Sequence, residues 1–207
     1  MHGIILADCK RRAMEGRLKK YFERHQTLTV SKAGAIGISR AMLSYMVRHG
    51  KLRRLAQGLY APVDEIPDEL LVISLRSPHI VFSHETALVL HKLHNRIPAM
   101  PTLTIPTGCR SPHSLDNAVT VYHIRKSLFD LGKTVVTSFQ GNAVPCYDYE
   151  RTICDVIRSR SRMDVETYTG AIRAYAASSS KNLPLLFRYA KEMGIERKVH
   201  MVMEVLA

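Results

Sequence analysis

The first sixty residues carry a succession of short patterns that leaves few folds open. Over residues 10–25 the apolar side chains recur at helical spacing, and lysine and arginine fill the opposite face. A second, shorter helix is predicted over residues 32–36, where Ser31 would cap its start and Gly37 would end it. A tight turn that contains this glycine then leads into a third helical pattern.

The third pattern, over residues 39–49, predicts an amphipathic helix with Ser39 as its N-cap and Gly50 just past its end. At about 100° per residue, one side of this helix is apolar. That side is formed by Met42, Leu43, Met46 and Val47. The opposite side is formed by Arg40, Ala41, Ser44, Tyr45 and Arg48. It holds two arginines and no acid that would repel a phosphate.

Two strand-like runs follow, residues 51–55 and 59–62, on either side of a turn that contains Gly58. This pattern predicts a β-hairpin. Helix, short helix, tight turn, helix and hairpin is the order of a winged helix-turn-helix, whose third helix has the size of an element that enters the major groove of DNA. We therefore predict an N-terminal winged helix-turn-helix DNA-binding domain over residues 1–62.

Positive charge is concentrated in this predicted domain. Thirteen Lys and Arg against three acids give the first sixty residues +10 of the chain's formal net charge of +12. Clustered cations favour nucleic acid, because each phosphate contact releases counterions. The predicted DNA-binding residues are Ser31, Lys32, Ser39, Arg40, Ser44, Tyr45, Arg48, Lys51, Arg53 and Arg54. Those of the third helix would face the major groove. Ser31 and Lys32 of the second helix would contact backbone phosphates, and Arg53 and Arg54 of the hairpin would contact phosphates or an adjacent minor groove.

The acidic stretch of residues 62–67, with a proline at each end, predicts a domain boundary. We expect residues 68–207 to form a mixed α+β domain with a small β-sheet and a C-terminal helical bundle. Helices are predicted over residues 68–75, 84–94, 149–158, 165–177, 183–194 and 196–206. Strands are predicted over residues 102–106, 118–124, 133–137 and 142–145. The last strand contains Pro145, which favours an edge strand or a strand end.

The histidines and cysteines indicate neither a metal site nor a cofactor. His84, His91 and His94 share roughly one helix face, but no carboxylate or cysteine lies at matching spacing, so we expect them at a basic domain interface. The four cysteines are scattered without a C-x-x-C pair, which suits a reducing cytosol. No apolar run is long enough for a membrane span, and we expect a cytoplasmic protein.

The carboxylates leave one enzymatic alternative open. Asp148, Glu150 and Asp155 lie near a predicted strand end, where a metal-dependent nuclease would place such acids beside a lysine. Arg151 and Asp155 are i,i+4 neighbours instead, which is typical of a helix ion pair. We therefore expect no enzyme, and we keep a DNA-directed metal-dependent nuclease that uses Asp148 and Glu150 as an alternative. A basic protein-interaction module is a second alternative.

Three stretches, in their order and spacing, carry a resemblance to a known family. Residues 50–60 (GKLRRLAQGLY) are similar to the wing of that family. Residues 83–91, with the predicted strand at 102–106, are similar to a helix of the family and the strand that follows it. Residues 149–157 (YERTICDVI) are similar to a later helix of the family. The chain thus resembles the AbiEi-type antitoxins of bacterial abortive-infection toxin–antitoxin systems, which act in phage defence and are also transcriptional regulators.

The resemblance implies two roles. The N-terminal domain would bind inverted repeats in double-stranded promoter DNA and repress its own operon. The C-terminal domain would counter a nucleotidyltransferase-like toxin, and a direct complex with that toxin is not required. Arg151, Thr152 and Asp155 match the family pattern, and we expect them to be structural.

Overall fold

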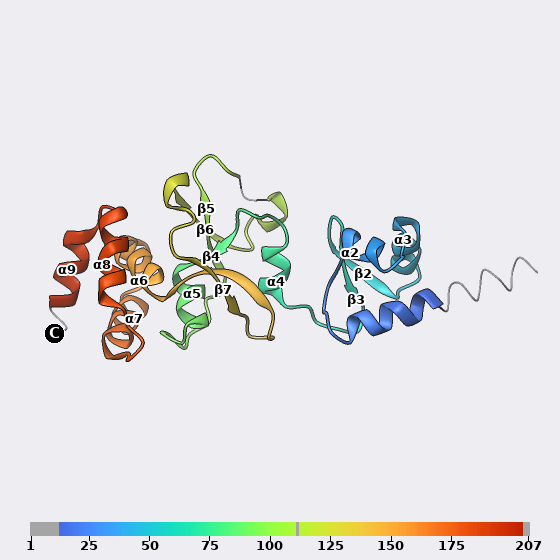
Figure 1. Ribbon diagram of the computed structural model, residues 1–207, viewed down its shortest axis with the longest axis horizontal. Helices are drawn as coiled ribbons and strands as arrows, with labels where there is room; N and C mark the ends of the chain where they lie inside the picture. Colours follow the sequence, from blue (N-terminus) through green and yellow to red (C-terminus); the bar gives the residue numbers. More distant parts are fainter. Residues whose placement is uncertain (1–12, 111, 205–207) are drawn as a thin grey trace, which may run out of the picture. The chain divides into compact units, whose positions relative to one another are not determined.

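The computed structural model describes residues 13–110 and 112–204, and it divides the chain into two compact units, Met1–Val72 and Ile73–Ala207 (Figure 1). Residues 10–12 and 205–206, which belong to two of the predicted helices, lie outside the described residues. Helices and two small sheets make up the described part of the chain, which confirms the predicted α+β class. The predicted limits of the two domains stay a prediction.

The first unit is built from short elements around a small sheet. A first helix covers residues 13–22 of the described chain. It is followed by β1 (Leu28–Thr29), α2 (Val30–Ala35), α3 (Arg40–Arg48), β2 (Leu52–Ala56) and β3 (Leu59–Pro62). The strands are antiparallel in the order β1-β3-β2, and β2 and β3 form the predicted hairpin. Their core is Leu18, Leu28, Ala33, Ile38, Leu43, Met46, Leu52 and Tyr60.

The start of α2 differs from the prediction. Thr29, not Ser31, is the N-cap, and its hydroxyl oxygen accepts a hydrogen bond from the Lys32 amide at 3.3 Å. The helix begins earlier because β1 pairs with β3 and delivers the chain to Thr29 in an extended conformation. The amide of Val30 also donates to the carbonyl of Gly58 at 3.0 Å, which ties the start of α2 to the hairpin turn.

The start and end of α3 follow the sequence signals. Ser39 is its N-cap, as predicted, and the hydroxyl accepts a hydrogen bond from the Met42 amide at 3.2 Å. Gly50 follows the helix with φ of +64°, a conformation that costs little for glycine, and the Lys51 amide donates to the carbonyl of Met46 at 2.9 Å. Burial of Leu43 and Met46 fixes which face of α3 is directed outward.

The second unit contains a five-stranded mixed sheet. Helix α4 (Glu69–Ser74), capped by the carboxylate of Asp68, spans the boundary between the units. The strands of the sheet are β4 (Val81–Phe82), β5 (Thr102–Pro106), β6 (Thr120–Ile124), β7 (Lys133–Thr137) and β8 (Ala143–Tyr147). Helix α5 (His84–Leu90) lies between β4 and β5 in the chain. The strand order is β6-β5-β4-β8-β7, with β5 parallel to β6 and β4 parallel to β8. Short 3-10 turns lie at His113–Leu115, Lys126–Leu128 and Arg160–Arg162.

The position of Pro145 corrects the prediction of an edge strand. β8 lies inside the sheet, between β7 and β4. Proline is tolerated there because β4 has only two residues and pairs with β8 only at Phe82 and Cys146. Pro145 itself lies opposite Val135 of β7.

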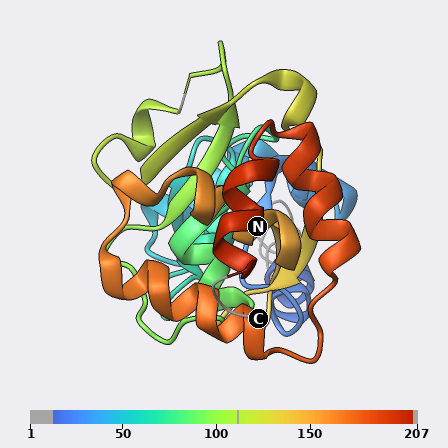
Figure 2. The same cartoon turned by 90° about the vertical axis from the view of Figure 1, so that its left-hand side faces the viewer.

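Four helices complete the second unit: α6 (Tyr149–Arg158), α7 (Val165–Ala177), α8 (Leu183–Glu192) and α9 (Glu196–Glu204). α6 is central, since it packs against α5, α7, α8 and α9 (Figure 2). Its residues from Glu150 to Ile157 are all buried. A helix that is buried on every side forces its polar side chains to find partners inside the protein.

Arg151 is the largest fully buried side chain among the described residues. Its Nε donates to Asp155 Oδ2 at 3.1 Å, and its Nη1 donates to the carbonyls of Leu128 and Leu131 at 2.8 and 2.6 Å. The guanidinium also lies 4.1 Å from the ring centre of Tyr147. Burial raises the pKa of Asp155, and the neighbouring Arg151 and Arg158 oppose that shift. The predicted helix ion pair is thus present, and it is entirely buried.

Replacement of Arg151 by methionine is expected to lower the free energy of unfolding by about 3–5 kcal/mol, because Asp155 would remain buried without its main partner. The double variant Arg151→Met/Asp155→Leu should recover most of this loss, since both charges are then removed. Urea unfolding of each variant measures the effect, with the exposed Arg173→Met on α7 as the control. A loss below about 1 kcal/mol for Arg151→Met would contradict this role.

His84 is a second buried polar group of this unit. Its ring stacks on Tyr122 at 3.5 Å between ring centres, and its two nitrogens lie 2.9 and 3.0 Å from the hydroxyls of Ser83 and Ser159. Burial, reinforced by Arg158, Arg162 and Arg151, holds the pKa of His84 well below its usual value. The histidine is therefore neutral in the folded protein at neutral pH.

A neutral buried histidine makes stability depend on pH in a defined direction. The unfolded chain takes up a proton at His84 near the ordinary pKa of about 6.5, whereas the folded protein does not. The free energy of unfolding should therefore fall as the pH drops below about 6.5, by up to about 1.4 kcal/mol per pH unit. Urea unfolding at several pH values should show a shallower dependence in His84→Gln, and an unchanged dependence in the exposed-histidine control His123→Gln. Equal slopes in all three proteins would refute the assignment.

Candidate nucleic-acid interface

The outer face of α3 holds four of the predicted DNA-binding side chains. Arg40, Ser44 and Arg48 are exposed and recur every four residues, so they follow one side of the helix. Tyr45 is half-buried and stacks on His49, with 3.8 Å between ring centres. His49 Nδ1 lies 2.8 Å from the Tyr45 carbonyl, which fixes the ring pair at the end of the helix. This face thus combines exposed cations with one fixed aromatic ring.

The structure brings part of this face together with the hairpin. Arg40 and Ser44 of α3 line the same depression as Arg54 of β2, and none of its described lining residues is acidic. Gln57, in the hairpin turn, lines it too and was absent from the predicted set. The available signal was its position beside Gly58 in the predicted turn, because turn residues lie at the surface, and Gln57 is exposed. The depression offers guanidinium, hydroxyl and amide groups within one concave surface.

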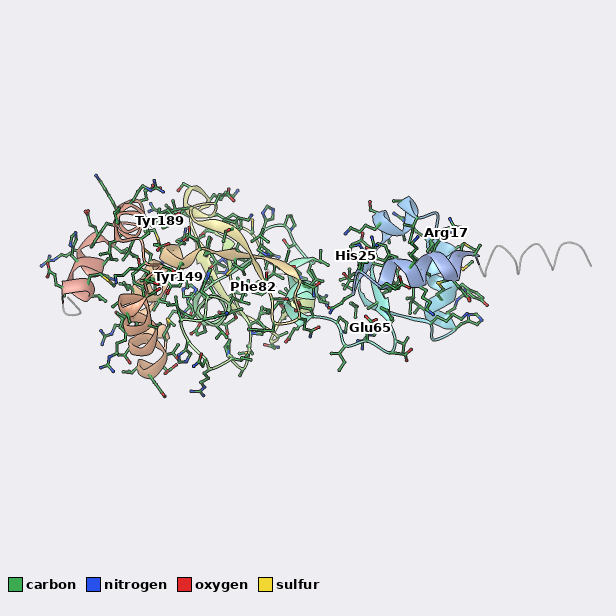
Figure 3. The ribbon with its side chains drawn as sticks, turned by 60° about the horizontal axis from the view of Figure 1, so that its bottom comes forward. Arg17, His25, Glu65, Phe82, Tyr149 and Tyr189 are labelled. Atoms are coloured by element: carbon green, nitrogen blue, oxygen red, sulfur yellow. The ribbon has the colours of Figure 1, made fainter. Side chains whose placement is uncertain are left out.

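The three basic residues of the hairpin have different surroundings. Arg54 is exposed, and its Nε donates to the Ala56 carbonyl at 3.3 Å. Lys51 forms an ion pair with Glu15 of the first helix. Arg53 is half-buried and donates to the backbone carbonyl of Glu65, a residue labelled in Figure 3. Arg54 is therefore accessible to a ligand, whereas Lys51 and Arg53 already bind other parts of the first unit.

The remaining predicted residues lie on α2 and at the start of α3. Ser31 and Lys32 are exposed on α2. The hydroxyl of Ser39 is engaged as the cap of α3, so its contribution to binding would come from the backbone at the helix start. Contact of any of these ten residues with DNA stays a prediction.

The carboxylates of the nuclease alternative have structural roles. Asp148 caps α6 by accepting the Arg151 amide at 2.8 Å, and its other oxygen accepts the Tyr189 hydroxyl at 2.8 Å; Tyr189 is labelled in Figure 3. Burial, together with this carboxylate, raises the pKa of Tyr189 to about 12, so the phenol remains a donor. Glu150 is buried and accepts the Asn182 amide at 2.8 Å. Both carboxylates are thus occupied within the protein.

The three histidines considered for a metal lie in separate environments. His84 is buried beside Ser83 and Ser159 inside the second unit. The prediction that it lies at a basic domain interface is therefore wrong for this histidine. His91 Nε2 lies 2.7 Å from the Tyr147 carbonyl, and His94 Nε2 lies 3.5 Å from the Thr167 hydroxyl. Within the described ranges, no three His, Cys, Asp or Glu side chains gather as metal ligands.

Comparison with known proteins relates the first unit to a family of transcriptional regulators. Residues 17–63 match the family described as "Transcriptional regulator, AbiEi antitoxin", which confirms the resemblance over the helices and the hairpin of the first unit. No curated protein matches the chain. Among solved structures, the fold is similar to that of the RV2827C protein from Mycobacterium tuberculosis, with a TM-score of 0.67 and 14% identity over 94% of this chain and 78% of that one.

In the part of the chain that the structure describes, no helix is long and apolar enough to cross a membrane.

Proposed function

We propose that the first unit is a winged helix-turn-helix that binds promoter DNA, with α3 in the major groove and the β2–β3 hairpin as the wing. The observation that carries this proposal is the depression in which Arg40 and Ser44 of α3 meet Arg54 of the hairpin without an acid among its described lining residues. Arginine is the side chain best suited to bind phosphate or the guanine edge through two hydrogen bonds. The family match over residues 17–63 supports a regulator.

The division of labour along this surface follows from its chemistry. Contacts to phosphates set the register and supply affinity, but they carry no sequence information. Sequence would be read by the outer face of α3, where Arg48 is exposed, free of acidic neighbours on its own helix, and able to reach a guanine edge. Lys32 and Arg54 would hold the backbone on either side of the groove.

The family match also supports the biological role that we propose for the whole chain: a cytoplasmic antitoxin that represses its own operon by binding inverted repeats in the promoter. The second unit would counter a nucleotidyltransferase-like toxin, without a need for a stable complex between the two proteins. We assign no catalytic role to the chain, since Asp148 and Glu150, the acids that a nuclease would use, already bind Tyr189 and Asn182.

Promoter recognition is tested with a duplex of the chain's own upstream DNA and a scrambled duplex of the same composition, at two salt concentrations. We expect selective binding to the promoter with a steep loss of affinity as salt rises. Arg48→Ala should weaken promoter binding by roughly 1–3 kcal/mol and reduce selectivity, and the second-unit variant Arg197→Ala should behave like the wild type. Equal loss on both duplexes would make Arg48 a phosphate contact, and equal wild-type binding to both would refute sequence-specific repression.

The absence of nuclease activity is a separate expectation. Supercoiled plasmid incubated with the full chain and Mg²⁺ should remain intact, because Asp148 and Glu150 are held by hydrogen bonds inside the second unit. Gel electrophoresis over a time course measures nicking. Nicking by the wild type that disappears in Asp148→Asn and persists in the exposed-acid control Glu166→Gln would establish the enzyme instead.

A further inference from the structure

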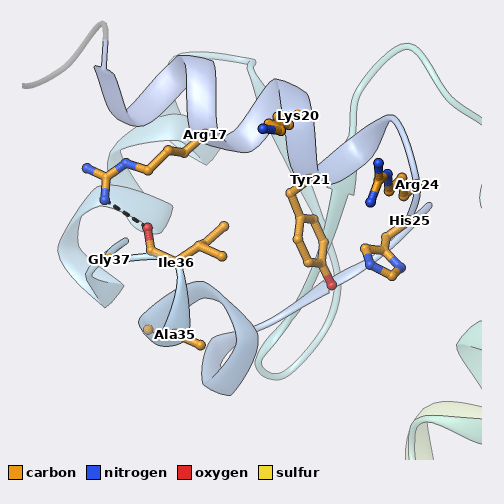
Figure 4. A pocket seen from close by; sticks show the side chains of 9 residues that line it. Arg17, Lys20, Tyr21, Arg24, His25, Ala35, Ile36 and Gly37 are labelled. Carbon is orange, nitrogen blue, oxygen red and sulfur yellow. Dashed lines mark hydrogen bonds between the residues drawn. The ribbon is translucent and has the colours of Figure 1, made fainter.

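The first unit has a second basic depression, apart from the one between α3 and the hairpin. Five residues between positions 17 and 25 line it, opposite the end of α2: Arg17, Lys20, Tyr21, Arg24 and His25 (Figure 4). None of the described residues that line this depression is acidic. Its other wall is formed by residues 34–37, which include two glycines and no charged side chain.

The cations of this depression lie on the last turns of the first helix and just beyond its end. Arg17 and Lys20 occupy positions i and i+3 of the helix, which are neighbours on its surface, and Arg24 lies in the turn that follows residue 22. Arg17 and Lys20 are about 4.5 Å apart along the helix axis and Arg24 lies beyond its end, whereas one strand of B-DNA presents a phosphate about every 3.4 Å along its axis. The row is therefore long enough to face two or three phosphates of one strand.

Two of these cations have side chains that are open to a ligand, and the third, Arg17, is hydrogen-bonded within the first unit. Arg17 Nη1 donates to the Ile36 carbonyl at 3.0 Å, the hydrogen bond drawn in Figure 4. Lys20 and Arg24 are exposed, and within residues 13–110 and 112–204 neither side chain has an ion-pair or hydrogen-bond partner. Tyr21 and His25 line the same depression as a ring pair with 4.5 Å between centres, and the Tyr21 hydroxyl donates to the Thr27 carbonyl at 3.3 Å. Free cations thus flank a fixed aromatic surface.

The depression adjoins the turn that positions α3. Arg17 reaches the C-cap of α2 at Ile36, and Gly37 follows with φ of +75°. That conformation favours glycine, and a Cβ atom at Gly37 would lie 2.6 Å from Arg17 Nη1 and displace the end of the arginine side chain. Ser39, the cap of α3, comes two residues later. The basic face of the first helix is thereby fixed to the same turn that sets the direction of α3.

We infer that Lys20 and Arg24 form a second DNA contact that binds the sugar–phosphate backbone of the duplex beside the site read by α3. This inference rests on the proposed function of the first unit. The contact would supply affinity without selectivity, since phosphates look alike in every sequence. It would also lengthen the stretch of backbone that the protein protects.

The full chain carrying Lys20→Gln and Arg24→Gln tests this inference on the promoter and scrambled duplexes. Affinity for both should fall by the same factor, roughly tenfold at 0.1 M salt, and the slope of log K against log salt should become shallower by about 2. The ratio of the two affinities should stay at the wild-type value. The control Lys126→Gln/Arg197→Gln removes the same charge from exposed positions of the second unit and should change neither slope nor ratio.

Each other outcome is decisive. An unchanged salt slope in the Lys20/Arg24 variant would overturn the second contact while promoter selectivity, and with it the proposed function, still held. A wild-type protein without promoter selectivity would refute the proposed function, and the slope would then report on the depression alone. A single-stranded RNA of equal length is the third probe: weaker RNA binding with unchanged duplex binding would make the depression a single-strand site and overturn the assignment.

Discussion

One buried ion pair, that of Arg151 and Asp155, constrains how the second unit packs around α6. Arg151 joins Asp155, one turn along α6, to the carbonyls of Leu128 and Leu131 in the segment before β7. That segment can approach α6 only because Gly132 has no side chain: a Cβ there would lie 2.6 Å from the Cβ of Arg151. A buried charge is costly unless every partner is in place, so the sheet and the helices around α6 must assemble together. The fold is therefore specified by this polar centre as well as by the apolar core.

In the first unit, the short helix α3 packs on a small core through Leu43 and Met46. Hydrogen bonds to backbone carbonyls fix the segments around it. The Val30 amide binds the Gly58 carbonyl and attaches α2 to the hairpin, and Arg17 binds the Ile36 carbonyl at the turn before α3. Leu43 and Met46 then set the rotation of α3 about its axis. The position of its basic face is thus fixed by groups that carry no specificity of their own.

Local signals were sufficient for the elements with a clear period or cap. The Ser39 cap, the hairpin and β5 were predicted correctly because each is encoded by a few adjacent residues. Strands β1 and β4 were missed, since two residues show no alternation and exist only through pairing with distant segments. The i,i+4 spacing predicted the ion pair of α6 but not its complete burial. The burial is possible because Arg151 also binds the carbonyls of Leu128 and Leu131, which lie 23 and 20 positions earlier in the sequence. Nor could the sequence separate free cations from engaged ones.

That separation determines how the charge of the first unit can act. The net charge counts Arg17, Lys51 and Arg53 as equal to the rest, yet these three bind the Ile36 carbonyl, Glu15 and the Glu65 carbonyl. A phosphate would have to compete with those partners, whereas Arg40 and Arg48 of α3 are exposed. Counterion release follows the number of phosphates actually neutralised, so binding strength should track geometry more closely than net charge. The engaged cations instead connect the first helix, the turn and the hairpin through the Ile36 carbonyl, Glu15 and the Glu65 carbonyl.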